Sequence, residues 1–258
     1  MTSAGDQAGT DRGPLGRVGF ETGSDTYERA RPGYPDAAVA HLAGLAGIGP
    51  ARRVLDLAAG TGKLTRQLQA RRARCLAVEP SASMREVFAT TVHGVPVVGG
   101  TAERIPVVTG AVDAVVVAQA FHWFDAPVAL AEMARVLRPG GWLGLIWNER
   151  DETDPMVAEL VRISRWDRSA PYPVGMDFGA VVGRSGLFGP VERTKYEWVQ
   201  WLERDTFVDQ VASRSYVQVL APVDRRALLD QVAAFAATLS EPIAMPYVAD
   251  LFCARVTR

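Results

Sequence analysis

The chain has 258 residues, a length that fits one α/β domain or one such domain with an insertion. Its 28 Lys and Arg residues nearly match its 29 Asp and Glu residues, so the net charge of −1 creates no overall basic field, and we expect no nucleic-acid partner. No stretch approaches the roughly 18 uncharged apolar residues of a membrane-spanning helix, and the polar N-terminus lacks the apolar segment of a signal peptide. We therefore expect a cytoplasmic protein without a membrane partner.

The cysteines and histidines follow no metal-binding pattern. Cys75 and Cys253 lie in apolar runs and are expected to be buried thiols rather than a disulfide pair. The histidines His41, His93 and His122 are scattered along the chain, with no two at ligand spacing. We expect no metal site.

The first half of the chain alternates between predicted strands and predicted helices. Residues 1–23 are polar and Gly-rich and predict a disordered tail. A helix is expected over 35–47, and further helices begin after Gly62, at an N-cap Ser81, and near Pro127. The predicted strands cover 52–58, 74–79, 96–100, 112–120 and 142–148. Because these strands are apolar throughout, rather than at every second residue, they predict a parallel sheet with helices on both faces.

The alternation ends after Asn148. Residues 149–190 contain a predicted helix near 155–165 and a Pro-rich aromatic loop, too little for a separate core, and are expected to form a small insertion over one end of the sheet. Predicted strands at 191–201 and 244–256 enclose two helices, near 205–213 and 224–239. We therefore expect one domain over 24–258, with 24–148 as the cofactor-binding half, 149–190 as the insertion or cap, and 191–258 as the C-terminal strands and helices.

The loop after the first strand is the first candidate for ligand binding. It runs from Asp56 through Gly60 and Gly62 to Lys63, and it lies at the carboxyl end of a strand, where ligands bind in open parallel sheets. A P-loop would require glycine at position 57, where Leu57 stands, and the dinucleotide fingerprint would require a third glycine where Thr65 stands. The loop therefore favours a nucleotide-type ligand without a pyrophosphate, although a glycine turn without a ligand is an alternative.

Glu79 ends the second predicted strand. A carboxylate at that position can accept hydrogen bonds from both hydroxyls of a ribose. A solvent-exposed glutamate is the alternative, but the neighbouring glycine loop favours the ribose role.

Five successive motifs resemble those of class I S-adenosylmethionine-dependent methyltransferases, and most closely the type 11-like bacterial small-molecule methyltransferases. The motifs are VLDLAAGTGKLT, AVEPSASM, GGTAERIP, VDAVVVAQAFHWF and RVLRPGGWLGLIW. The resemblance implies a Rossmann-like α/β fold with a seven-stranded, mostly parallel sheet whose last strand is antiparallel. It also implies S-adenosyl-L-methionine as the cofactor and a small molecule as the methyl acceptor, with oxygen or carboxylate acceptors favoured.

The same resemblance implies roles for particular residues. Asp56, Gly60 and Gly62 would hold the methionine end of the cofactor, and Glu79 would hold its ribose. The residues expected around the adenine are Pro80, Met84, Thr101 and Ala102, with Gln119 beside the methionine moiety. Many relatives carry aspartate where Thr101 stands, which weakens the expectation of a side-chain bond to the adenine amine.

His122 is the candidate catalytic residue. It follows the fourth strand, where methyl donor and acceptor should meet, and an imidazole there can deprotonate a hydroxyl. The alternative is that His122-Trp123-Phe124 forms a packed corner, since a carboxylate acceptor needs alignment and desolvation but no base.

Two further segments are expected to border the acceptor. The run from Tyr27 to Pro35 resembles a segment that closes over the cofactor, which places Tyr27, Arg31 and Tyr34 at a lid, with Arg31 pairing a carboxylate of cofactor or acceptor. A surface turn anchored by the two tyrosines is the alternative. In the insertion, Trp166, Tyr172 and Phe178 are expected to form a wall or lid of the pocket.

Two other functions compete with methyl transfer. One is a regulatory protein that keeps the fold and the cofactor without turnover; the other is an NAD-dependent oxidoreductase, which the missing third glycine disfavours. Neither the acceptor nor the oligomeric state follows from these patterns.

Overall fold

The computed structural model describes residues 28, 30–165 and 177–257. The predicted tail over 1–23 and three of the predicted lid residues, Tyr27, Trp166 and Tyr172, lie outside these described residues. None of the described helices is long and apolar enough to cross a membrane.

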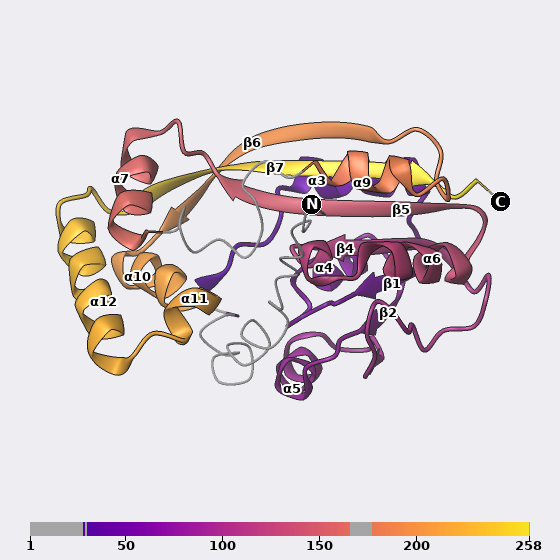
Figure 1. The fold of residues 1–258 in the computed structure, drawn as a ribbon, viewed down its shortest axis with the longest axis horizontal. Coiled ribbons are helices and arrows are strands. Elements are labelled where there is room, and N and C mark those ends of the chain that lie inside the picture. The colour runs from indigo at the N-terminus through magenta and orange to yellow at the C-terminus, as the bar shows by residue number, and fades with distance from the viewer. Residues whose placement is uncertain (1–27, 29, 166–176, 258) are drawn as a thin grey trace, which may run out of the picture.

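A seven-stranded sheet forms the centre of the molecule (Figure 1). Its strands are β1 (Arg53–Leu57), β2 (Arg74–Val78), β3 (Val97–Val98), β4 (Val112–Ala118), β5 (Leu137–Arg150), β6 (Glu192–Leu202) and β7 (Ile243–Arg255). Their order across the sheet is β3-β2-β1-β4-β5-β7-β6. The first five strands pair in parallel, whereas β7 lies antiparallel between β5 and β6. The predicted mostly parallel α/β sheet with an antiparallel last strand is confirmed.

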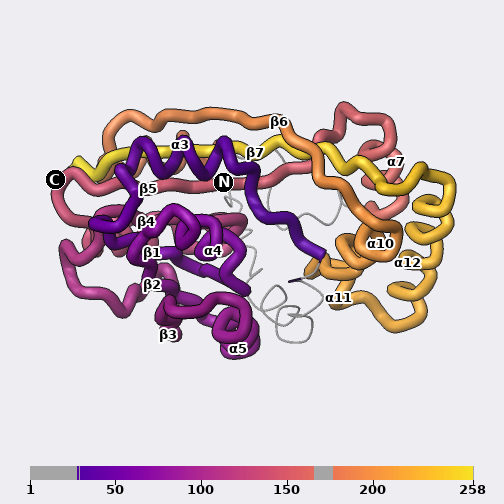
Figure 2. Tube along the Cα trace, turned by 180° about the vertical axis from the view of Figure 1, so that it is seen from behind, coloured from indigo at the N-terminus to yellow at the C-terminus, as the bar shows by residue number. Residues whose placement is uncertain are grey.

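Helices cover both faces of this sheet. On one face α3 (Asp36–Ala46) and α4 (Lys63–Ala70) pack on β1, β4 and β7 through an apolar cluster that includes Leu42, Leu64 and Leu68 (Figure 2). On the other face α6 (Ala126–Val136) and α9 (Phe178–Arg184) contribute to a second cluster around β4 and β5. The all-apolar composition of the central strands is explained by this burial on both sides.

The local sequence rules identify most helix starts. α5 (Ala82–Thr91) begins after Ser81, whose Oγ accepts a hydrogen bond from Met84 N at 3.4 Å, as predicted for an N-cap. Pro35 is the N-cap of α3 rather than a residue of its first turn. The short helix α9 was not predicted, because its sequence FGAVVGR has two glycines and only seven residues.

The strand predicted over 142–148 is longer in the structure. β5 begins at Leu137, which pairs with Val112 before a register shift, so the Arg138-Pro139-Gly140-Gly141 run is part of an irregular strand and not only a turn. At its other end β5 continues to Arg150, which pairs with Tyr247 of β7. The long antiparallel partner supplies the extra backbone hydrogen bonds, a contribution that the local sequence does not reveal.

A separate group of helices lies at the far ends of β5, β6 and β7 (Figure 1). It consists of α7 (Pro155–Ser164), α10 (Arg204–Ala212), α11 (Ser215–Gln218) and α12 (Pro222–Ala237). Their buried residues, among them Leu160, Phe207 and Val232, form an apolar cluster with the ends of β6 and β7. Within 149–190, the two helices that the structure describes are therefore in different places, α7 in this group and α9 on the sheet.

Candidate active site

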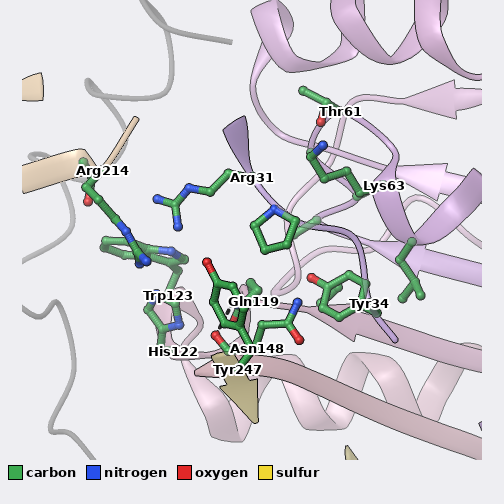
Figure 3. A pocket seen from close by; sticks show the side chains of 17 residues that line it. Arg31, Tyr34, Thr61, Lys63, Gln119, His122, Trp123, Asn148, Arg214 and Tyr247 are labelled. Atoms are coloured by element: carbon green, nitrogen blue, oxygen red, sulfur yellow. Dashed lines mark hydrogen bonds between the residues drawn. The ribbon is translucent and has the colours of Figure 1, made fainter. Parts of the chain in front are cut away.

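A pocket opens where the carboxyl ends of β1, β4 and β5 face the C-terminal helices (Figure 3). The sheet side contributes Ala58, Ala59, Gly60, Thr61, Gln119 and Asn148. The start of α11 contributes Arg214 and Ser215, the sheet strand β7 contributes Tyr247, and the N-terminal segment contributes Arg31, Pro32 and Tyr34. This is the edge of a parallel sheet at which ligands bind in doubly wound folds.

Two of the strand ends that face the pocket have unusual backbone conformations. Ala58 follows β1 with φ 56°, and Gln119 follows β4 with φ 55°. Residues other than glycine rarely adopt this left-handed region, and such residues concentrate at functional sites. Gln119 is held there by hydrogen bonds from its N to the Ile146 carbonyl (3.0 Å) and from its Nε2 to the Asn148 carbonyl (2.8 Å).

Glu79 joins the glycine loop to the end of β2. Its Oε2 accepts a hydrogen bond from Gly60 N and its Oε1 accepts one from Ser81 N, each at 2.9 Å. Burial raises the pKa of this carboxyl, and the two backbone bonds oppose that effect. The carboxylate is thus fixed beside Gly60. A Cβ atom added at Gly60 would meet no other atom within 4 Å, so the space next to this residue is open.

The two glycines of the loop have different surroundings. Gly60 lines the pocket with φ +57°, and the space beside it is open. Gly62 has φ +86° and lies outside the pocket lining; a Cβ there would come within 2.3 Å of Val92 Cγ2 and 2.8 Å of Phe88 Cδ2. Gly62 therefore allows α4 to pack closely on α5, whereas Gly60 leaves room for a ligand.

Asp56 is completely buried beneath the loop. Its Oδ2 accepts a hydrogen bond from Thr65 Oγ1 at 2.5 Å, whereas its Oδ1 is buried without a hydrogen-bond partner in the described part of the chain. Burial raises the pKa of Asp56 to about 7, and the nearby Glu79 adds to this effect. Asp56 does not line the pocket; it ties the end of β1 to the first turn of α4.

The residues predicted around the adenine flank the β2 side of the loop. Met84 (3% exposed) and Ala102 (4% exposed) are buried, Thr101 is half-buried and Pro80 is exposed. None of these four lines the pocket between the sheet and the C-terminal helices.

The segment from Glu28 to Tyr34 is anchored at several points over the sheet edge. Gln67 accepts from Tyr34 N at 3.0 Å and donates to the Tyr34 carbonyl at 2.6 Å. Asn148 Nδ2 donates to the Gly33 carbonyl at 2.7 Å. Glu28 forms ion pairs with Arg66 (2.5 Å) and Lys63 (3.5 Å) at the start of α4. We call residues 28 and 30–34 the strap.

His122 lies on a short 3₁₀ turn, Phe121–Trp123, and lines the pocket. Its ring centroid is 4.7 Å from that of Trp123 and 6.0 Å from that of Trp147. Burial lowers the pKa of His122 to about 3. The imidazole is therefore neutral at physiological pH, and it is a much weaker base than the value near neutrality that suits general-base catalysis.

Phe178 does not form a pocket wall as predicted. It is 2% exposed and stacks on Trp147 with ring centroids 4.1 Å apart, with Phe121 and Phe252 at its edges. The helix α9 points the Phe178 side chain into the core. The aromatic composition of the segment does not indicate whether a side chain faces the pocket or the core.

Several pocket residues were not identified from the sequence. Asn148, near the end of β5, follows the rule that strand ends carry the site, and Lys63, the first residue of α4, ends the loop that the sequence had marked without a role of its own. Arg214 and Tyr247 come from the C-terminal half, and no local pattern marks them, because the place of Arg214 depends on how the helices pack and that of Tyr247 on the pairing of β7 with β5.

Comparison with known proteins agrees with this geometry. Residues 55–145 match a methyltransferase domain family. An uncharacterized methyltransferase of Mycobacterium tuberculosis is 42% identical over 248 residues, which cover 93% of this chain and 96% of that protein. The chain belongs to the class I S-adenosylmethionine-dependent methyltransferases.

Solved structures share the fold of this methyltransferase. A putative methyltransferase from an antibiotic biosynthesis pathway of Anabaena variabilis superposes with a TM-score of 0.65 at 18% identity, covering 86% of this chain and 98% of that one. Phosphoethanolamine N-methyltransferase 2 of Haemonchus contortus, solved with phosphomonomethylethanolamine and S-adenosylhomocysteine, gives a TM-score of 0.55 at 15% identity, with coverage of 92% and 58%.

Proposed function

We propose that this methyltransferase uses S-adenosylmethionine as its methyl donor and a small molecule as its acceptor. The observation that carries the proposal is the pairing of Glu79 with Gly60: a fixed carboxylate beside a backbone with open space, at the carboxyl edge of a parallel sheet. The hydroxyl of Thr61, the next residue, is buried in the pocket lining with no hydrogen-bond partner among the described residues. An orphaned hydroxyl at this place fits a polar ligand.

The residues at the glycine loop and at the neighbouring strand ends would hold the donor as follows. Glu79 would accept hydrogen bonds from the ribose hydroxyls, and Gly60 would let the methionine portion approach the backbone beside Gln119. Pro80, Met84, Thr101 and Ala102 would border the adenine. Asp56 would act indirectly, by fixing α4 through Thr65. When bound, S-adenosylmethionine supplies a methyl group activated by a positively charged sulfur.

The chain's own contribution to the reaction is alignment and the exclusion of water. Arg31, Pro32 and Tyr34 of the strap line the pocket together with Trp123, His122 and Tyr247. Since His122 is neutral and weakly basic, we place it in the pocket wall rather than in a proton transfer. This arrangement suits an acceptor that is already nucleophilic, such as a carboxylate.

Calorimetric titration with S-adenosylhomocysteine and with NAD tests the proposal. We expect one S-adenosylhomocysteine bound per chain and no detectable binding of NAD, because Thr65 occupies the position of the third dinucleotide glycine and is fully buried. Binding of NAD but not S-adenosylhomocysteine would overturn the assignment. Binding of S-adenosylhomocysteine without turnover on any acceptor would indicate a regulatory protein of the same fold.

A further inference from the structure

Two arginines from distant parts of the chain line the pocket, and a third, which is not among the lining residues, is close enough for its charge to act on one of them. Arg31 belongs to the strap, Arg150 ends β5, and Arg214 lies between α10 and α11. Figure 3 shows Arg31 and Arg214 extending toward one another from opposite sides of the pocket that both of them line. Arg31 Nη2 also donates to the carbonyl of Ser213, the neighbour of Arg214, at 3.4 Å.

Each arginine of this cluster has at least one guanidinium nitrogen that is buried. Burial is the main cause that lowers the pKa of Arg214, and the positive charges of Arg31 and Arg150 lower it further, against the opposing effect of Tyr247 and Tyr216. The Nε and Nη2 atoms of Arg150 are buried and have no hydrogen-bond partner within the described part of the chain. A buried cation without such bonds is destabilising unless an anion joins it.

The described residues of the pocket supply cations but no acidic side chain. Its lining includes Arg31, Arg214 and Lys63, and no aspartate or glutamate is among the lining residues. The carboxylate of Glu28, which is the acidic residue of the strap, is engaged by Arg66 and Lys63 at the start of α4. His122, also in the lining, is neutral.

We propose that Arg31, Arg150 and Arg214 bind an oxyanion group of the methyl acceptor, a carboxylate or a phosphate, so that the substrate is a small acid. This inference rests on the proposed function. Guanidinium groups offer planar pairs of N–H donors that match the oxygens of carboxylates and phosphates. Figure 3 shows Arg214 across the pocket from Thr61 and Lys63 at the glycine loop, and Arg150 pairs with the pocket residue Tyr247 in the sheet, so an anion held by these arginines would lie apart from a donor bound at the loop.

The test is a titration of small anions into the protein, free and loaded with S-adenosylhomocysteine. The probes are succinate and glycerol 3-phosphate, with succinamide and glycerol as neutral counterparts, so that the two sources of an oxyanion are distinguished. We expect at least one anion to bind the loaded protein, more weakly at higher salt, and neither neutral compound to bind. The variant Arg150→Gln should weaken anion binding about tenfold or more while changing the S-adenosylhomocysteine affinity less than about twofold.

Two controls make the result decisive. Arg226→Gln, at an exposed arginine on α12, should change neither affinity. The melting temperature of the ligand-free Arg150→Gln protein should rise, because the substitution removes a buried charge from a cluster of like charges.

Three results would overturn the inference. They are equal binding of the neutral compounds, the absence of anion binding at millimolar concentration, and a lower melting temperature in Arg150→Gln but not in Arg150→Met, which keeps an apolar stem and would point to an acidic partner within the chain. Competition between the anion and S-adenosylhomocysteine would assign the cluster to the donor's own carboxylate instead. If S-adenosylhomocysteine fails to bind the parent protein, the proposed function is wrong, whatever the anions do.

Discussion

Glu79 is the single side chain on which donor binding depends most. Both of its oxygens already accept backbone hydrogen bonds, which fix the carboxylate in place before any ligand arrives. We expect Glu79→Ala to weaken the binding of S-adenosylhomocysteine by about 1.5–3 kcal/mol, because charge-assisted bonds to two hydroxyls are lost. Calorimetry on folded protein measures this, with Glu86→Ala, at an exposed glutamate of α5, as the control. An unchanged affinity would remove Glu79 from the ribose site.

His122 provides a test based on pH. Because burial lowers its pKa from 6.5 to about 3, the folded protein binds fewer protons at His122 than the unfolded chain does between these two values. The free energy of unfolding therefore keeps its full contribution from the neutral His122 above pH 6.5, and it loses that contribution as the pH falls toward 3. We expect His122→Gln to lose less stability on acidification than the parent and to keep its rate within about tenfold at neutral pH.

Thermal melts and rates recorded across this pH range measure both effects, with His93→Gln, at an exposed histidine, as the matched control. A rate lower by roughly 10²–10⁴-fold, together with the loss of the acid limb of the pH–rate profile, would instead make His122 a general base.

At the scale of elements, the two glycines in the turn from β1 into α4 have different roles: Gly60 leaves room for a ligand, and Gly62 allows close packing of helices. In Gly62→Ala the new Cβ would clash with Val92 and Phe88, and we expect a loss of about 2–4 kcal/mol in the free energy of unfolding. In Gly60→Ala the Cβ meets open space, so the loss should be only about 1–2 kcal/mol, from the left-handed backbone. The affinity for S-adenosylhomocysteine should show the reverse order. Denaturant unfolding and calorimetry on both variants measure the two quantities, and equal effects of both substitutions would contradict the separation.

The elements of the cofactor half were predictable because their determinants are local. β1, β2 and β4 are short apolar runs bounded by turns, and Ser81 marks the start of α5. The elements with non-local determinants were not. The full length of β5 depends on pairing with β7, and the position of α9 depends on a stack of Phe178 on Trp147.

At the scale of the whole molecule, the sheet edge and the C-terminal helices together enclose the pocket. The sequence identifies the sheet side, because strand ends follow a rule of position. It does not identify Arg150 or Arg214, since nothing in SRSYVQ or NERDET distinguishes a pocket arginine from a surface one. Arg214 comes close to Arg31 and Arg150 because the helical group packs against the ends of β6 and β7.

Methyl transfer itself tests the central claim most directly. S-Adenosylmethionine labelled in its methyl group would be incubated with the protein and an extract of its producing cell, with Glu79→Ala as the control, and the products separated by size and charge before mass spectrometry. We predict label in a small molecule whose precursor carries a carboxylate or a phosphate, with much less label formed by the variant. Label confined to protein or nucleic acid, or equal labelling by the parent and Glu79→Ala, would contradict the account.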